Sequence, residues 1–226
     1  MEEATEKKRE VIERALAYPF ATPEGSFALV EGEAQDLGAA EVDGSTRVPL
    51  LAYGSNAAPV SLCRKLGPGA DPLPVIRATL HDFDAVYSAH VASYGSVPAT
   101  LLRSRGTELA AFVAFPTDEQ LERISATEPN YELGAMRIEC RLETGEELVE
   151  AHVYLSRHGC LLVSGSAAAV REIAARYRAL PAMGQRQVLE HVRDQLRPGQ
   201  DLEGFILDCV AGEAPHGGAL DRGAAP

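Results

Sequence analysis

Two short stretches of the sequence contain residue types that could bind a small anion or accept a proton. In the first, an apolar run at residues 48–52 leads into Tyr53-Gly54-Ser55-Asn56. A strand that ends in such a turn before a helix leaves backbone N–H groups without partners, and these can bind a carboxylate, phosphate or oxyanion. Gly54 would permit a close approach of the backbone or a positive φ. The simpler alternative is a helix cap, in which Ser55 or Asn56 accepts a hydrogen bond from the first turn.

The second stretch is Glu128-Pro129-Asn130-Tyr131, which follows a predicted short helix. A glutamate acts as a general base when it lies within hydrogen-bond reach of the proton that it accepts. Taken alone, each residue also has an ordinary structural interpretation. Glu128 could be a solvent-exposed carboxylate at a helix end, and Tyr131 could be a core tyrosine whose hydroxyl contacts solvent. Residue type alone leaves both interpretations open.

Other clusters of chemically active side chains give weaker signals. On a predicted strand, His81 points to the opposite face from Asp82 and Asp84, so these side chains and the nearby His90 do not predict a metal site. Residues 163–166, Val-Ser-Gly-Ser, lack the second glycine of a nucleophile elbow and fit a helix N-cap. We therefore expect neither a metal site nor a nucleophilic serine at these positions.

Composition and charge limit the class of protein. The chain has 226 residues and a net charge of −12, which argues against nucleic acid or an anionic membrane surface as a partner. No apolar run is long enough to span a membrane, and the charged N-terminal stretch is unlike a secretory signal peptide. The four cysteines are scattered, without CxxC spacing, as is typical of reduced and mostly buried thiols. These features predict a cytoplasmic protein.

Hydrophobic periodicity and turn residues predict the elements that must position the two stretches. An amphipathic helix is expected over residues 4–17, and a short strand with a loop over 25–46. From residue 47 onward we expect strands at 50–53, 75–80, 85–88, 99–102 and 109–115, a hairpin of 135–142 with 148–155, and helices at 59–66, 119–126, 166–180 and 183–196.

This order of elements predicts an α+β fold, in which a mixed sheet or a small barrel is flanked by helices. Periodicity does not tell whether the barrel closes. We expect residues 1–46 to form an N-terminal helix and extension, 47–155 the core, 156–210 a C-terminal helical extension, and 211–226 a disordered tail.

The two stretches, taken with the residues between them, resemble the γ-glutamylcyclotransferase family. Tyr53-Gly54-Ser55-Asn56 ends the first core strand, Pro98-Ala99-Thr100-Leu101 follows about forty residues later, and a strand and a short helix then lead to Glu128 and Tyr131. The resemblance covers roughly residues 47–155. It implies a mixed sheet that closes into a small barrel, and an enzyme of the acyltransferase or lyase type. Such an enzyme converts a γ-glutamyl amide into 5-oxoproline and a free amine or amino acid, without a cofactor.

The resemblance also assigns roles to residues. It implies that Glu128 is the general base and that the γ-glutamyl group is held by Tyr53, Gly54, Ser55, Asn56 and Tyr131.

The chain differs from the family pattern at a few positions. Ile124-Ser125 stands where Leu-Asp is usual, and Pro129 stands where a glycine usually follows the glutamate. Two alternatives therefore stay open: a non-catalytic binding or regulatory module for a small carboxylate ligand, and an amide hydrolase that uses water. The segments outside residues 47–155 have no matched counterpart, and they could form a specificity lid or the surface of a homo-oligomer.

Overall fold

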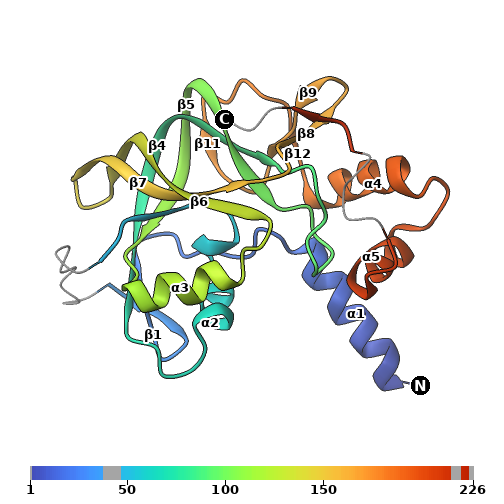
Figure 1. The fold of residues 1–226 in the computed structure, drawn as a ribbon, viewed down its shortest axis with the longest axis horizontal. Coiled ribbons are helices and arrows are strands. Elements are labelled where there is room, and N and C mark those ends of the chain that lie inside the picture. Colours follow the sequence, from blue (N-terminus) through green and yellow to red (C-terminus); the bar gives the residue numbers. More distant parts are fainter. Residues whose placement is uncertain (1, 38–46, 215–219, 224–226) are drawn as a thin grey trace.

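The computed structural model describes residues 2–37, 47–214 and 220–223 (Figure 1). Its centre is a closed barrel of strands β3 (Leu50–Ala52), β4 (Leu73–Tyr87), β5 (Ala99–Ala114), β6 (Tyr131–Leu142) and β7 (Glu147–Ser156). The strands follow the order β5-β3-β7-β6-β4, and a further pairing of β4 with β5 closes the ring. The pairing of β3 with β7 is parallel and the others are antiparallel. The predicted α+β class and the closed mixed barrel are both confirmed.

Strands β4 and β5 are longer than the sequence predicted. The expected strands 75–80 and 85–88 are one strand, and so are 99–102 and 109–115. The apparent break in β4 is a bulge at Asp82, where φ is 62° and the register with β5 shifts. The Asp82 carboxylate stabilises this bulge by accepting a hydrogen bond of 2.6 Å from the N–H of Gly106. A bulge bends the strand without ending it, which helps the sheet to curl.

Two short helices cover one side of the barrel and lie beside the end of β3. Helix α2 (Pro59–Leu66) and helix α3 (Asp118–Ala126) were both predicted, and a capping box between Thr117 and Gln120 begins α3. Leu50 and Ala52 pack in one apolar cluster with Leu62 and Ile124 of these helices, whereas Leu51 packs in the other main cluster. Because β3 is buried on both faces, its sequence is a continuous apolar run rather than an alternating one.

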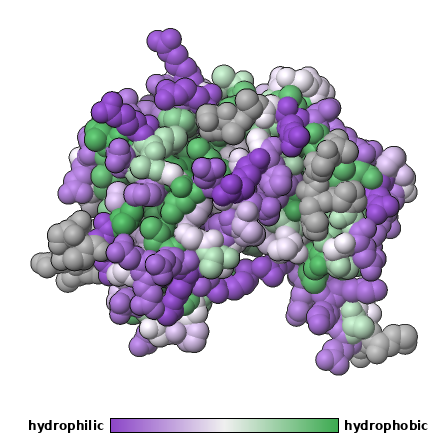
Figure 2. All heavy atoms as spheres, in the orientation of Figure 1, coloured by the Kyte–Doolittle hydropathy of each residue, from purple (hydrophilic) through white to green (hydrophobic). Residues whose placement is uncertain are grey.

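The remaining helices lie at the two ends of the chain. Helix α1 (Glu2–Leu16) matches the predicted amphipathic helix and packs against α5 (Leu202–Ala211), which has Asp201 as its N-cap. Helix α4 (Gln185–Leu196) matches the predicted helix at 183–196. In the view of Figure 2 most of the surface is hydrophilic, and α1 projects as a hydrophilic arm. No helix in the described part of the chain is long and apolar enough to cross a membrane.

The predicted helix at residues 166–180 is wrong. This segment contains the short strands β9 (Ser166–Ala167), β10 (Ala169–Val170) and β11 (Ala175–Arg176). Strand β10 pairs with β4 and with β12 (Ala182–Met183), and β11 pairs with β5. The alanine-rich composition favours a helix. That preference is overridden because the Arg178 guanidinium forms two hydrogen bonds, of 2.8 and 2.9 Å, with the fully buried carboxylate of Asp84.

Strands from both outer segments pair with the barrel or its neighbours. Strand β1 (Phe27–Val30) pairs with β4 and with β2 (Glu33–Asp36), and residues 38–46 lie outside the described part. Near the other end, β13 (Arg222–Gly223) pairs with β8 (Cys160–Val163). Of the predicted tail, residues 215–219 and 224–226 lie outside the described part.

Candidate functional site

The turn after β3 presents two backbone donors for which the described residues provide no acceptor. The chain passes from Gly54 into the single 3-10 turn η1 (Ser55–Ala57), which has no side-chain cap. Within the described part of the chain, no acceptor is found for the N–H groups of Ser55 and Asn56. The Asn56 side chain does not cap a helix, since its amide binds Glu128. The helix-cap alternative is therefore wrong for Asn56, and the two N–H groups remain as candidate anion donors.

A glycine is needed at position 54 because another side chain lies close to its Cα atom, and not because its φ angle is positive. Its φ is −138°, so the left-handed conformation that glycine permits is not used. A Cβ atom at this position would lie 2.6 Å from the hydroxyl oxygen of Tyr18. That hydroxyl accepts a hydrogen bond of 2.7 Å from the N–H of Ala99 on β5. Tyr18, which lies just after helix α1, thus joins the turn to the barrel.

Glu128 lies next to this turn, immediately after helix α3. Its Oε1 accepts a hydrogen bond of 3.0 Å from Nδ2 of Asn56 and also forms an ion pair with Lys65 of α2. The Lys65 ammonium in turn donates to Oδ1 of Asn56 over 2.6 Å. The side chains of Glu128 and Lys65 are 13% and 12% exposed, so this ion pair is largely buried. No hydrogen bond within the described residues involves Oε2 of Glu128.

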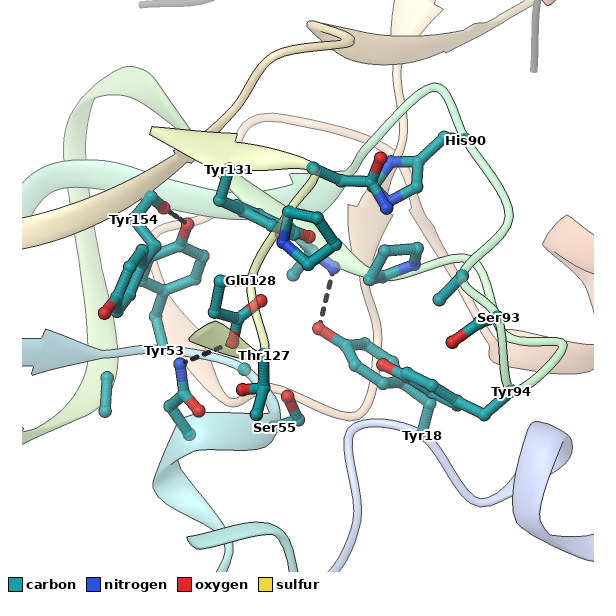
Figure 3. A pocket seen from close by; sticks show the side chains of 18 of the residues that line it. Tyr18, Tyr53, Ser55, His90, Ser93, Tyr94, Thr127, Glu128, Tyr131 and Tyr154 are labelled. Carbon is teal, nitrogen blue, oxygen red and sulfur yellow. Dashed lines mark hydrogen bonds between the residues drawn. The ribbon is translucent and has the colours of Figure 1, made fainter. Parts of the chain in front are cut away.

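The turn and Glu128 form two walls of one cavity of about 320 Å³ (Figure 3). In this close view Glu128 lies between Ser55, Tyr53 and Tyr131, and His90, Ser93 and Tyr94 line the far side. Five tyrosine side chains contribute to the lining: Tyr18, Tyr53, Tyr94, Tyr131 and Tyr154. All six residues that the sequence nominated, Tyr53, Gly54, Ser55, Asn56, Glu128 and Tyr131, line this cavity.

The hydroxyl groups of Tyr53 and Tyr131, the two tyrosines predicted to bind substrate, each donate a hydrogen bond within the protein. Tyr131 donates a hydrogen bond of 2.8 Å to the carbonyl oxygen of Ala99, and Tyr53 donates to the carbonyl oxygen of Tyr154. Burial raises the pKa of both phenols above the ordinary value, so both are neutral hydroxyls. Their contact with a ligand stays a prediction, and it would involve the ring or a hydroxyl lone pair.

Sequence reasoning missed several cavity residues. Tyr18 and Tyr94 lie outside the quoted motifs, and nothing in their local sequence marks them. Lys65 lies on the predicted helix α2, but only the tertiary fold brings it to Glu128. Ser125, which replaces the usual aspartate, lies with its Oγ 2.6 Å from the hydroxyl oxygen of Tyr154, so it supports one wall of the cavity.

Metal ligation and reactive thiols do not contribute to this cavity in the described part of the chain. Among the described residues, no group of three or more His, Cys, Asp or Glu side chains is placed to hold a metal ion. Cys140, Cys160 and Cys209 are buried, as the sequence predicted, and Cys63 is partly exposed.

Comparisons with known proteins were made for the sequence and for the fold. No protein-family model matches the chain, and no curated protein sequence is significantly similar to it. Among solved structures the chain is similar to a protein from Arabidopsis thaliana known from a solution structure (19% identity, TM-score 0.38), which it matches over 49% of this chain and 62% of that one. It is also similar to a γ-glutamyl cyclotransferase (18% identity, 50% and 68% covered, TM-score 0.38). A third is a γ-glutamyl cyclotransferase specific to glutathione from yeast (9% identity, 74% and 98% covered, TM-score 0.36).

The solved structures that resemble this chain thus include γ-glutamyl cyclotransferases, as the sequence motifs predicted. The class defined by the strand pairings is a closed, mixed α+β barrel. At these identities and TM-scores the likeness says nothing about the reaction, which has to be inferred from the site.

Proposed function

We propose that this protein converts a γ-glutamyl amide into 5-oxoproline and a free amine or amino acid. The observation that carries the proposal is the placement of Glu128. Its carboxylate faces the same cavity as the turn at residues 54–56, with Oε1 fixed by Asn56 and Lys65 and with Oε2 left without a hydrogen bond in the described structure.

The chemistry of ring closure requires such an arrangement. The α-amino group of the substrate, with a pKa of about 8, is largely protonated at neutral pH and must lose a proton before it attacks. In the proposed reaction Oε2 of Glu128 accepts that proton, the amine nitrogen forms a bond to the γ-carbonyl carbon, and an oxyanion develops on the carbonyl oxygen. The C–N bond to the leaving group then breaks, and the same proton passes from Glu128 to the departing nitrogen. The ring nitrogen loses its second hydrogen as a proton to the released amine, so the products are a neutral lactam and an ammonium group.

The turn has a matching role in this proposal. The unpaired N–H groups of Ser55 and Asn56 would donate to the developing oxyanion, which is the usual function of such donors in acyl transfer. Closure of a five-membered ring is intramolecular, so holding the substrate in a folded conformation provides much of the rate. The neutral tyrosine rings that line the cavity would exclude water from it.

One observation favours a second candidate, a module that binds a small carboxylate without turnover. Lys65 already contacts one oxygen of Glu128 in a largely buried ion pair, so this carboxylate has a structural role that needs no reaction. An amide hydrolase is the third possibility, because water could attack the same carbonyl group.

Product analysis separates these candidates. The purified protein is incubated with γ-glutamyl amino acids, γ-glutamyl amines and glutathione, and both 5-oxoproline and glutamate are quantified. The proposed reaction yields 5-oxoproline, whereas hydrolysis yields glutamate. Binding of a panel member by calorimetry, with no product from any of them, would instead support the binding module. The Glu128→Gln variant serves as the control for contaminating activity.

A further inference from the structure

The hydroxyl group of Tyr18 is a buried donor that faces the cavity. Tyr18 is 3% exposed, and it lines the same cavity as Glu128. Its oxygen accepts the hydrogen bond of 2.7 Å from the N–H of Ala99, which holds the hydroxyl in one place. Within the described part of the chain, no oxygen or nitrogen accepts the hydroxyl proton itself. The proton is therefore left to a molecule that enters the cavity.

The Tyr18 hydroxyl is a neutral donor. Burial raises its pKa well above the ordinary value, and the neighbouring Tyr94, Tyr53 and Glu128 raise it further, against the opposing effect of the hydrogen bond from Ala99. A phenolate at this position would be desolvated and repelled by the carboxylate. Because the oxygen already accepts one hydrogen bond, its O–H is polarised and becomes a better donor to a second partner.

This hydroxyl lies beside the turn that follows β3. A Cβ atom on Gly54 would come within 2.6 Å of the Tyr18 oxygen, so the hydroxyl occupies the space next to the Gly54 backbone. The two residues that follow, Ser55 and Asn56, carry the N–H groups for which the described residues provide no acceptor. Two backbone donors and one side-chain donor thus adjoin one another along the same wall of the cavity.

Glu128 faces these donors. In the close view the hydroxyl end of Tyr18 points toward the carboxylate of Glu128 (Figure 3), and the charge of Glu128 raises the pKa of Tyr18, so the two groups are near each other. No hydrogen bond joins them within the described structure. A base on one side and hydrogen-bond donors on the other is the arrangement that an acyl-transfer site needs around the reacting carbonyl group.

We propose that the Tyr18 hydroxyl donates a hydrogen bond to the γ-carbonyl oxygen of the substrate and to the oxyanion that it becomes. This inference rests on the proposed function. As the substrate amine forms its bond to the carbonyl carbon, an electron pair moves onto the oxygen, and the hydrogen bond from Tyr18 strengthens without transfer of its proton. When the C–N bond breaks and the carbonyl forms again, the charge leaves the oxygen. Tyr18 is then a catalytic residue outside residues 47–155, the segment that resembles γ-glutamylcyclotransferases.

The test removes this hydroxyl and keeps the ring. We measure kcat and KM for 5-oxoproline formation from γ-glutamyl-alanine, γ-glutamyl-ethylamine and glutathione with the wild type and Tyr18→Phe. The matched control is Ser96→Ala, which removes another buried hydrogen bond to the N-terminal segment, donated by Ser96 to the carbonyl oxygen of Ala15 over 2.8 Å, outside the cavity lining. Tyr177→Phe, at a tyrosine that is 73% exposed, controls for the loss of a phenol. Thermal melting checks that each variant is folded.

We expect Tyr18→Phe to lower kcat by about 10²–10³, the usual effect of removing one donor to an oxyanion, with KM changed by less than about threefold. Both controls should keep kcat within about threefold of the wild type. An unchanged kcat in Tyr18→Phe overturns the inference, and so does an equal loss in Ser96→Ala. A rise in KM at unchanged kcat also overturns it, because the hydroxyl would then bind only the ground state.

A second variant guards against the failure of Tyr18→Phe to fold. Gly54→Ala leaves the hydroxyl in the chain but displaces it from the turn, so it should also lower kcat. In the Tyr18→Phe background the same substitution should lower kcat little further, because the two changes remove one contact. A folded Gly54→Ala variant with the kcat of the wild type would refute the placement of the donor.

If the wild type forms neither 5-oxoproline nor glutamate from these compounds, the proposed function fails and binding decides the role of Tyr18 separately. Calorimetry then measures the affinity of 5-oxoproline, which carries the same carbonyl group, for the wild type, Tyr18→Phe and Ser96→Ala. A loss of affinity of about three- to tenfold that is confined to Tyr18→Phe supports a hydrogen bond from the hydroxyl to the ligand. Equal affinities, or no binding, refute it.

Discussion

Lys65 contacts the same carboxylate oxygen of Glu128 that Asn56 binds, and it also donates to the amide oxygen of Asn56. The three side chains form a closed triangle that joins helix α2, the turn after β3 and the end of helix α3. Oε1 of Glu128 is thereby held in place, and Oε2 faces the cavity. The contacts that position the carboxylate thus leave Oε2 available to a substrate.

Replacement of Glu128 by glutamine should abolish most of the turnover of a γ-glutamyl substrate. The amide keeps the shape of the side chain but does not accept a proton from an ammonium group, and loss of a general base costs about 10²–10⁴ in rate. The rate of 5-oxoproline formation is measured together with a far-UV circular dichroism spectrum. A folded variant with activity within a few-fold of the wild type would remove Glu128 from the mechanism.

The Lys65–Glu128 ion pair should contribute measurably to stability, because both side chains are nearly buried. A double-mutant cycle of Lys65→Met and Glu128→Gln should give a coupling free energy of about 1–3 kcal/mol by chemical denaturation. The exposed pair Arg123–Glu119 on helix α3 is the control, and it should give only about 0.3–0.5 kcal/mol. If both pairs give the same small value, the Lys65–Glu128 contact is not a stabilising one.

Gly54→Ala should destabilise the protein through Tyr18. The new Cβ atom would collide with the Tyr18 hydroxyl, which must move away from the N–H of Ala99. We expect a loss of about 1–3 kcal/mol in the free energy of unfolding, as for other overpacked sites. In a Tyr18→Phe background, which lacks the hydroxyl, the same substitution should cost clearly less. Costs that simply add would show that Tyr18 is not the reason for the glycine.

Asp84→Asn should be far more damaging to the fold than a change at an exposed ion pair. Asp84 is fully buried and Arg178 is 13% exposed, so the substitution leaves a buried cation without its partner. Breaking such a pair costs about 3–5 kcal/mol. The comparison is Glu108→Gln, which removes the longer and exposed contact to Arg176 and should cost less than about 1 kcal/mol. Urea titrations of both variants measure the difference, and a similar loss in both would contradict the buried pairing.

Cysteine alkylation should follow burial. Burial raises the pKa of the Cys140 thiol to about 12 and that of Cys209 to about 11, so little reactive thiolate is present at about pH 8. Cys63 is partly exposed and should react first with iodoacetamide. Mass spectrometry of the folded protein reads out the order, and the unfolded protein is the control in which all sites react. Modification of Cys140 before Cys63 would contradict the described packing.

The predictable parts of the fold were those with local signals. Alternation and a turn predicted the hairpin of β6 and β7, and periodic apolar residues predicted α1, α2, α3 and α4. Closure of the barrel depends on the pairing of β4 with β5 and on the bulge at Asp82. Neither feature produces a periodic pattern of apolar residues in the sequence. The segment around Arg178 was misread because its alanine content favours a helix, whereas its actual conformation is set by a partner 94 residues earlier.

The same distinction applies to the candidate site. The turn and Glu128 were found because each lies in a short motif with characteristic residues. Lys65 and Tyr18 were not found, because each reaches the site only when a helix or a terminal segment packs against the barrel. Residues that depend on such packing have ordinary local sequences.

The buried pair of Asp84 and Arg178 has a consequence for the order of events during synthesis on the ribosome. Asp84 is made early, within the second barrel strand, and its partner emerges only 94 residues later. Until then, closing the barrel would place a carboxylate in an apolar interior without compensation, which is unfavourable. A nascent chain that ends near residue 155 already contains every barrel strand, yet we expect it to stay open and sensitive to protease. Protection should appear only when the growing chain has released residue 178 from the exit tunnel.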